Sequence, residues 1–158
     1  MYNAVRLHQS LAFRAWFGTA TSSYARYDKW MNLVCAGCPW DHKPQLAKKY
    51  RFRSGDYFLD VAGTNQKVTY EVLSNLHYGY VGKHYTLGDG ILLGAQNLNI
   101  PGVTGRRDPA DDVAVAAGFA LRDRYGPGEL QSHHVEAAIL NALPDMDSAN
   151  PDSVQPRW

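Results

Sequence analysis

The run from Val113 to Leu121 constrains the fold more than any other part of the chain, because it contains no polar side chain. Asp108 has the character of a helix N-cap, and Pro109 suits the first helical position. Asp111 and Asp112 are interpreted as helix-start residues that place negative charge at the positive end of the helix dipole. A helix that is apolar on every side has to be buried. We therefore predict a mainly α (α+β) fold, a compact helical domain around this buried central helix.

Hydrophobic spacing and turn residues predict the other elements. Apolar side chains recur at helical intervals in residues 1–20, 24–34, 40–50, 86–98 and 129–143. Residues 57–61 and 67–70 are rich in aromatic and β-branched side chains and are separated by turn residues at 63–66. This arrangement predicts one small β-hairpin.

The length of 158 residues suggests a single domain with a substantial core. Residues 1–143 are expected to form the catalytic domain. Residues 144–158 contain three Pro and several Asp residues. This composition predicts a polar C-terminal tail, packed on the domain or trailing from it.

The net charge of +1 lacks the excess of positive charge that drives general binding to nucleic acids. A local basic group still suits an anionic polymer, either RNA or an anionic cell wall; its members are Lys48, Lys49, Arg51 and Arg53. Ten Tyr and four Trp residues offer surfaces that stack on sugars or bases, although such side chains also fill cores.

The segment from Tyr70 to Gly82 is the densest in side chains that carry chemistry. Wound as a helix at about 100° per residue, it has a polar face and an apolar face. The polar face carries Glu71, Ser74, Asn75 and Tyr78, the apolar face carries Val72, Leu73, Leu76 and Tyr80, and His77 lies between them. Glycine inside a helix costs about 1 kcal/mol. Gly79 and Gly82 therefore favour close approach of another segment or a ligand. The alternative to a functional role for the polar face is an ordinary amphipathic helix whose polar face is solvated.

Three carboxylates are candidates for acid–base chemistry. Glu71 is first, because aromatic neighbours favour the protonated form that a general acid needs, although its place at a helix start favours the ionised form. Asp41 is second, with capping of the short helix after it as an equal alternative. Asp60, on the predicted hairpin, is third.

Cys35 and Cys38 form a C-x-x-C pair without a second pair of cysteines. A zinc site would need histidine ligands in addition, and no βαβ pattern supports a thioredoxin-like site. We keep two alternatives, a small disulfide loop beside Asp41 and two packed thiols. If the protein is secreted, we expect the disulfide, and titration of thiols in denatured, unreduced protein tests this.

Three stretches together resemble the polymorphic toxin type 44 domain. They are Asn-Leu-His-Tyr-Gly-Tyr-Val-Gly at 75–82, Pro-Trp-Asp-His-Lys-Pro at 39–44 and Asp-Pro-Ala-Asp at 108–111. The resemblance covers roughly residues 31–124, and the octapeptide is its specific part. Bacterial members are carried by toxin systems and were predicted to be RNases. A group of secreted fungal muramidases looks related, which implies a lysozyme-like architecture in general terms.

Two enzymatic hypotheses and one binding hypothesis follow. In the first, a muramidase, Glu71 is the general acid and Asp41 the second carboxylate. The residues expected to bind the glycan are Trp40, Lys43, Asn75, His77, Tyr78 and Tyr80. In the second, a metal-independent RNase, His77 acts with His42 or Lys43. In the third, the polar helix face only recognises a partner. The cleft is expected between the hairpin, the Glu71 helix and the Asp41 loop.

The sequence contains no HExxH, EF-hand, P-loop or GxSxG pattern. His133 and His134 point about 100° apart on a helix, so they do not form a paired metal site. We therefore expect no metal and no nucleotide cofactor. The expected partner is peptidoglycan, with an immunity protein if the source is a bacterial toxin system, and the expected state is a monomer.

The first residues, Met1 to Leu11, lack the apolar core of a signal peptide, and no run reaches the length of a membrane span. We interpret the chain as the mature or catalytic part of a longer, secreted product.

Overall fold

The computed structural model describes residues 23–35, 37–52, 58–85, 88, 90, 92–93 and 108–157, and the structural statements below concern these residues. The helices are α3 (Ser23–Val34), α4 (Lys43–Tyr50), α5 (Glu71–His84), α7 (Pro109–Arg124) and α8 (Ser132–Ala149), followed by the 3-10 turn η1 (Pro151–Ser153). The strands are β1 (Phe58–Asp60), β2 (Gln66–Thr69) and β3 (Val154–Pro156). The predicted mainly α fold with a little β structure is confirmed.

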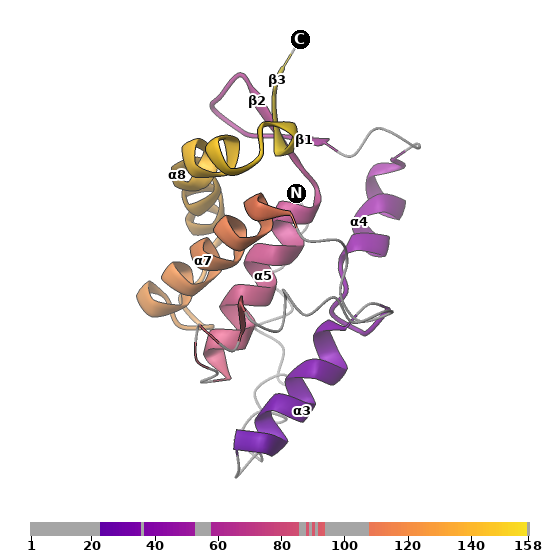
Figure 1. Cartoon of the computed structure of the whole chain (residues 1–158), viewed down its shortest axis with the longest axis vertical. Helices are drawn as coiled ribbons and strands as arrows, with labels where there is room; N and C mark the ends of the chain where they lie inside the picture. The colour runs from indigo at the N-terminus through magenta and orange to yellow at the C-terminus, as the bar shows by residue number, and fades with distance from the viewer. Residues whose placement is uncertain are drawn as a thin grey trace.

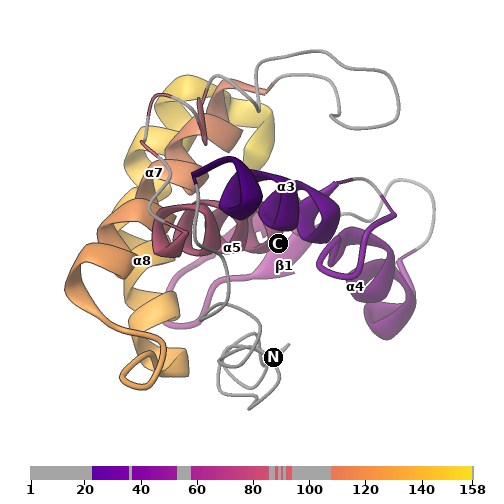
Figure 2. The same cartoon turned by 90° about the horizontal axis from the view of Figure 1, so that it is seen from below.

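Helix α5 runs through the middle of the molecule, with α7 and α8 on one side and α3 and α4 on the other (Figure 1). The view from below shows the same order, with α4 on the side of α5 away from α8 (Figure 2). The strands form one antiparallel sheet in the order β1-β2-β3, and β2 leads directly into α5. This sheet therefore fixes where α5 begins.

The crossing of α5 and α7 depends on two glycines. A Cβ atom on Gly118 would lie 2.7 Å from the Tyr80 backbone nitrogen and would overlap the Leu76 carbonyl oxygen. A Cβ atom on Gly79 would lie 3.0 Å from the Val115 carbonyl carbon. The backbones of the two helices therefore touch here. This contact explains why glycine is tolerated inside both helices, and it agrees with the close approach expected at Gly79.

Substitution of Gly118 by Ala is expected to lower the free energy of unfolding by about 1–3 kcal/mol, because the added methyl group meets rigid backbone rather than a movable side chain. Gly128→Ala is the matched control, since a Cβ atom there has nothing within 4 Å. Urea unfolding of both variants measures the difference. Equal midpoints for the two variants would contradict the close crossing.

The central helix is α5 rather than the apolar run of α7. Ala116 and Ala120 on α7 are exposed, so the expectation that residues 113–121 are buried on every side is wrong. Alanine tolerates exposure because its side chain offers little apolar area to water. The buried residues of α5 are Val72, Leu76, His77, Gly79, Tyr80, Val81 and Gly82, and they extend around most of the helix.

The C-terminal region differs from the prediction. Helix α8 continues through Pro144 to Ala149, whereas residues 144–158 were expected to be tail, because Leu143 and Met146 are buried and hold this part of the helix on the core. Strand β3 then pairs with β2, with Val154 opposite Val68. The predicted hairpin is thus the first part of a three-stranded sheet. The proposed boundary of the catalytic domain at residue 143 stays a prediction.

Helix α3 confirms the helix predicted at 24–34, and a turn with Gly37 at φ 76° follows it. Cys35 and Cys38 are joined by a disulfide across this turn, with their Cα atoms 5.1 Å apart. The helix predicted at 1–20 and most of the one predicted at 86–98 lie outside the described residues. Within the described part, no helix combines the length and apolar character of a membrane span.

Candidate functional site

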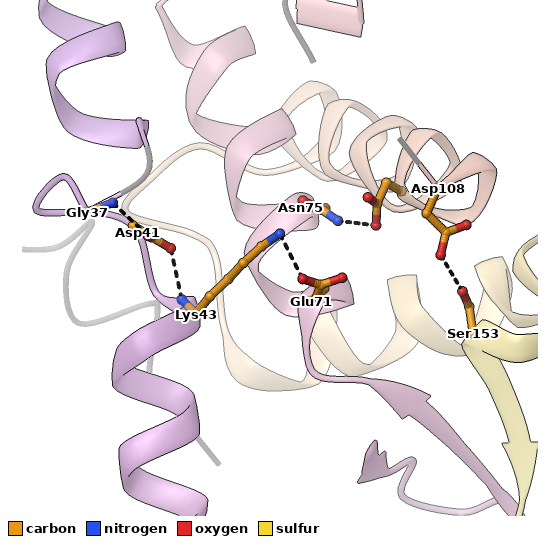
Figure 3. A network of polar contacts seen from close by, with 8 residues as sticks. Gly37, Asp41, Lys43, Glu71, Asn75, Asp108 and Ser153 are labelled. Carbon is orange, nitrogen blue, oxygen red and sulfur yellow. Dashed lines mark hydrogen bonds and ion pairs between the residues drawn. The ribbon is translucent and has the colours of Figure 1, made fainter. Parts of the chain in front are cut away.

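A polar cluster lies where the first turns of α4, α5 and α7 meet. The Lys43 ammonium on α4 lies 3.1 Å from Oε1 of Glu71, the first residue of α5. One turn along α5, the Asn75 amide donates a short hydrogen bond to the Asp111 carboxylate on α7. Figure 3 shows Lys43 reaching across to Glu71, with Asn75 drawn beside the end of the Lys43 side chain. The cluster therefore joins three segments that are far apart in the sequence.

Glu71 and Lys43 are both partly accessible, with side-chain exposures of 37% and 32%. Burial opposes the charged form of Lys43, but Glu71, Asp111 and Tyr70 together raise its pKa above the usual value, with Glu71 contributing most of the rise. An ion pair this exposed contributes little to stability, at most about 1 kcal/mol. The ion pair instead fixes where these two groups lie, because it holds a cation and a carboxylate together at the surface of the cluster.

Asp111 is the residue of this cluster that sequence reasoning did not select. Burial raises the pKa of its carboxyl to about 7, and the carboxylates of Glu71, Asp108 and Asp112 act in the same direction. The Lys43 ammonium opposes the rise. A carboxyl group with a pKa near neutrality can donate or accept a proton at physiological pH. Asp111 was explained only as a helix-start residue, and it does lie in the first turn of α7.

Asp41 has the capping role that the sequence left open. Its Oδ2 accepts a hydrogen bond from the Gly37 backbone amide at 2.9 Å, and its Oδ1 accepts one from the Lys43 amide at 3.1 Å (Figure 3). These bonds tie the turn after α3 to the start of α4. Asp41 therefore positions Lys43, and through it contributes to the cluster.

Asp60 takes part in a different contact. Its carboxylate lies 3.0 Å from the Arg157 guanidinium, and its side chain is 48% exposed. Because it sits on β1, opposite Lys67 of β2, it belongs to the sheet rather than to the polar cluster.

A cavity of about 610 Å³ lies on the opposite face of α5. Leu73, Leu76, His77 and Tyr80 line it from α5, and His42 and aromatic side chains line it from the α4 side. His42 and His77 are almost fully buried, and their ring centroids are 4.4 Å apart. Burial lowers the pKa of His42. The two imidazoles named in the RNase hypothesis are thus in contact, away from Glu71.

The remaining residues that were predicted to bind the glycan mostly contact other parts of the protein. Tyr80 is buried, and its hydroxyl donates to the Tyr125 carbonyl at 3.0 Å. The Tyr78 hydroxyl donates to the Leu92 carbonyl at 3.1 Å, and its ring lies 4.8 Å from that of Trp30. Trp40 is half-buried, with its ring edge-on to His77. Of these three, Trp40 and Tyr78 keep some surface accessible to a ligand.

The cluster of basic residues predicted at positions 48–53 lies partly within the described residues. Lys48, Lys49 and Arg51 are exposed at the end of α4, and Arg53 lies outside the described residues. Among the residues that are described, no group of three or more His, Cys, Asp or Glu side chains is arranged to hold a metal ion.

Comparison with known proteins identifies a family. The model of the family described as Ntox44, bacterial toxin 44, matches residues 29–124. No curated protein and no solved structure matches the chain. The matched segment contains the whole polar cluster and the paired histidines, and it ends at the last residue of α7.

Proposed function

The chain belongs to the bacterial toxin 44 family, which indicates a toxin function, and from this we propose that it is a catalytic toxin domain of the muramidase type. Its substrate is the glycan strand of bacterial peptidoglycan, and its reaction is hydrolysis of a glycosidic bond. The resemblance of this kind of domain to a group of secreted fungal muramidases favours this choice of reaction. The enzyme acts outside the cell that produces it, where cell wall is accessible.

The observation that carries this proposal is a pair of carboxyl groups in contrasting surroundings. Glu71 faces the Lys43 ammonium at 3.1 Å, whereas burial raises the pKa of Asp111 to about 7. Glycosidases commonly need one protonated and one ionised carboxyl beside the scissile bond. We therefore assign proton donation to Asp111 and the role of ionised carboxylate to Glu71. Asp111 replaces Asp41 as the second carboxylate, because both oxygens of Asp41 hold backbone amides.

The reaction then follows the general course of carboxyl-catalysed glycoside hydrolysis. The Asp111 carboxyl gives its proton to the glycosidic oxygen, so the leaving sugar departs as an alcohol. The Glu71 carboxylate stabilises the positive charge that develops on the sugar ring. It either takes a proton from a water molecule that attacks the anomeric carbon, or attacks this carbon itself and forms an ester, which water then hydrolyses while Asp111 takes back a proton. Lys43 keeps Glu71 in place, and the Asn75 amide orients the Asp111 carboxylate.

An assay of purified protein on two substrates tests the proposal. Insoluble peptidoglycan and total RNA are incubated side by side with the wild-type chain. We expect new reducing ends from peptidoglycan and intact RNA. Cleavage of RNA with no reducing ends from peptidoglycan would overturn the muramidase assignment, and activity on neither substrate would favour a binding module.

One observation favours a second candidate function, a metal-independent RNase. His42 and His77 are in ring contact at the wall of the cavity, and exposed cations of α4 lie in the neighbouring turns. Paired imidazoles can act as general acid and base on RNA. Their nearly complete burial and the lowered pKa of His42 count against this role, because one imidazole would have to carry a proton.

The two candidates differ in their response to His77→Ala. In the RNase this change removes an acid–base group and is expected to lower activity by about 10²–10⁴-fold. In the muramidase His77 lies on the far side of α5, so we expect the release of reducing ends to keep most of its rate. RNA cleavage that disappears in His77→Ala and survives in Glu71→Gln would establish the second candidate.

A further inference from the structure

The last residues of the chain contact the starts of both helices that carry the proposed catalytic carboxyls. We call residues 150–157 the C-terminal clamp; it consists of Asn150, the turn η1, strand β3 and Arg157. These residues lie beyond the segment matched by the family, which ends at residue 124. Neither the family match nor the muramidase proposal gives this region a role.

The first arm of the C-terminal clamp holds the start of α7. Asp108 caps this helix, with Oδ1 accepting from the Ala110 amide at 2.9 Å. Its other oxygen, Oδ2, accepts from the Asn150 side-chain amide at 2.9 Å and from the Ser153 hydroxyl at 2.8 Å. Ser153 is only 2% exposed, and Figure 3 shows it directed at Asp108. Both oxygens of Asp108 are thus committed one turn before Asp111.

The second arm holds the start of α5. Strand β3 pairs with β2 over three residue pairs, and the Arg157 amide donates to the Asn65 carbonyl at 2.8 Å. Strand β2 ends at Thr69, and α5 begins two residues later at Glu71. The Arg157 guanidinium also pairs with Asp60 of β1. The C-terminal clamp therefore fixes the segment from which Glu71 projects.

We propose that the C-terminal clamp positions the active site, holding the first turns of α5 and α7 in the register that places Glu71 beside Asp111. This inference rests on the function proposed above. Catalytic groups must be held to within a fraction of an ångström, and a misplacement of about 1 Å can lower a rate by about 100-fold. Asp108 and Ser153 are positioning residues in this arrangement, since they act through Asp111 rather than on substrate.

The pH midpoint at which Asp111 titrates distinguishes a positioning role from a purely structural one. If the C-terminal clamp only stabilised the fold, breaking it would leave this midpoint unchanged. The charged groups that face it are Lys43 from α4, Glu71 from α5 and Asp108 and Asp112 from its own helix. Loosening the start of α7 would admit water and weaken the effect of burial, so the pKa of Asp111 would fall. Asp108→Asn would lower the pKa further, since it also removes a neighbouring negative charge.

The experiment uses the full chain with Ser153→Ala, Ser153→Thr and the exposed-strand control Gln155→Ala. The Asp111 carboxyl is followed by NMR of carbon-labelled aspartate, and the rate on peptidoglycan is recorded against pH. We expect Ser153→Ala to lower the titration midpoint and the alkaline limb of the rate profile by about 0.5–1 pH unit. Ser153→Thr keeps the hydroxyl and is expected to restore both, and Gln155→Ala is expected to change neither.

The outcomes separate this inference from the proposed function. A Ser153→Ala variant that melts earlier but titrates like the wild type would overturn the positioning role. If Ser153→Ala does not fold, Asn150→Ala replaces it, because this change removes the other hydrogen bond to Asp108 Oδ2 without changing a charge. An unchanged Asp111 midpoint in Asn150→Ala would likewise overturn the positioning role. A shifted midpoint in a chain without activity on peptidoglycan would support the C-terminal clamp and reject the muramidase.

Discussion

Glu71→Gln is expected to lower the release of reducing ends from peptidoglycan by about 10²–10⁴-fold. The amide keeps the shape of the side chain and can still accept a hydrogen bond from Lys43. It carries no negative charge, so it can neither stabilise a cationic sugar nor activate water. The measurement is the initial rate on insoluble peptidoglycan at saturating substrate.

The matched control for this variant is Glu129→Gln, in the turn between α7 and α8. The Glu129 carboxylate accepts a hydrogen bond from the Gly126 amide at 2.8 Å, and a glutamine oxygen can do the same. Because the Lys43–Glu71 pair is partly exposed, both variants should melt close to the wild type. A Glu71→Gln chain that melts normally and retains the wild-type rate would remove Glu71 from the mechanism.

The sequence predicted the two faces of α5 well, because that pattern depends only on local geometry. Glu71 and Asn75 do meet polar partners on one face, and Val72 and Leu76 are buried on the other. Of the two glycines that looked unfavourable in this helix, Gly79 marks the crossing with α7, and Gly82 lies against the Leu92 side chain, as expected from the need for close approach of another segment. The helical period was sufficient for these predictions, because it fixes the direction of each side chain around α5 whatever segment packs against the helix.

Asp111 was missed because a local explanation already accounted for it. Acidic residues in the first turn of a helix are common, and the helix dipole explains them. What distinguishes Asp111 is its contact with Asn75 on α5, and that contact depends on how α5 and α7 cross. The clue available in the sequence was the position of the acidic residues directly before a long apolar segment.

Strand β3 was missed for a different reason. It has only three residues, ends in Pro156 and keeps two of its three side chains exposed, so it has little hydrophobic pattern. Its partner β2 lies far away in the sequence, and Val154 packs because Val68 is placed opposite. Pairing over such a distance is set by the whole fold rather than by the strand itself.

Asp111→Asn is expected to lower activity on peptidoglycan by about 10²–10⁴-fold, because it removes the proton donor and leaves the Asn75 contact able to form. In the wild type, proton donation requires the protonated carboxyl, so the rate should fall as the pH rises through about 7, the raised pKa of Asp111. Any residual rate of Asp111→Asn should lack this alkaline limb. A wild-type alkaline limb that persists in Asp111→Asn would assign it to another group.

The same substitution has a predictable effect on stability. Since the pKa of Asp111 is raised from 3.8 to about 7, the native chain keeps a proton that the unfolded chain releases between these values. The free energy of unfolding of the wild type therefore falls as the pH rises through this window. Asp111→Asn cannot ionise, so its urea midpoint should exceed that of the wild type increasingly from pH 4 to pH 7. A difference that stays constant with pH would show that Asp111 does not carry the raised pKa. The assignment of Asp111 as the acid would then be wrong.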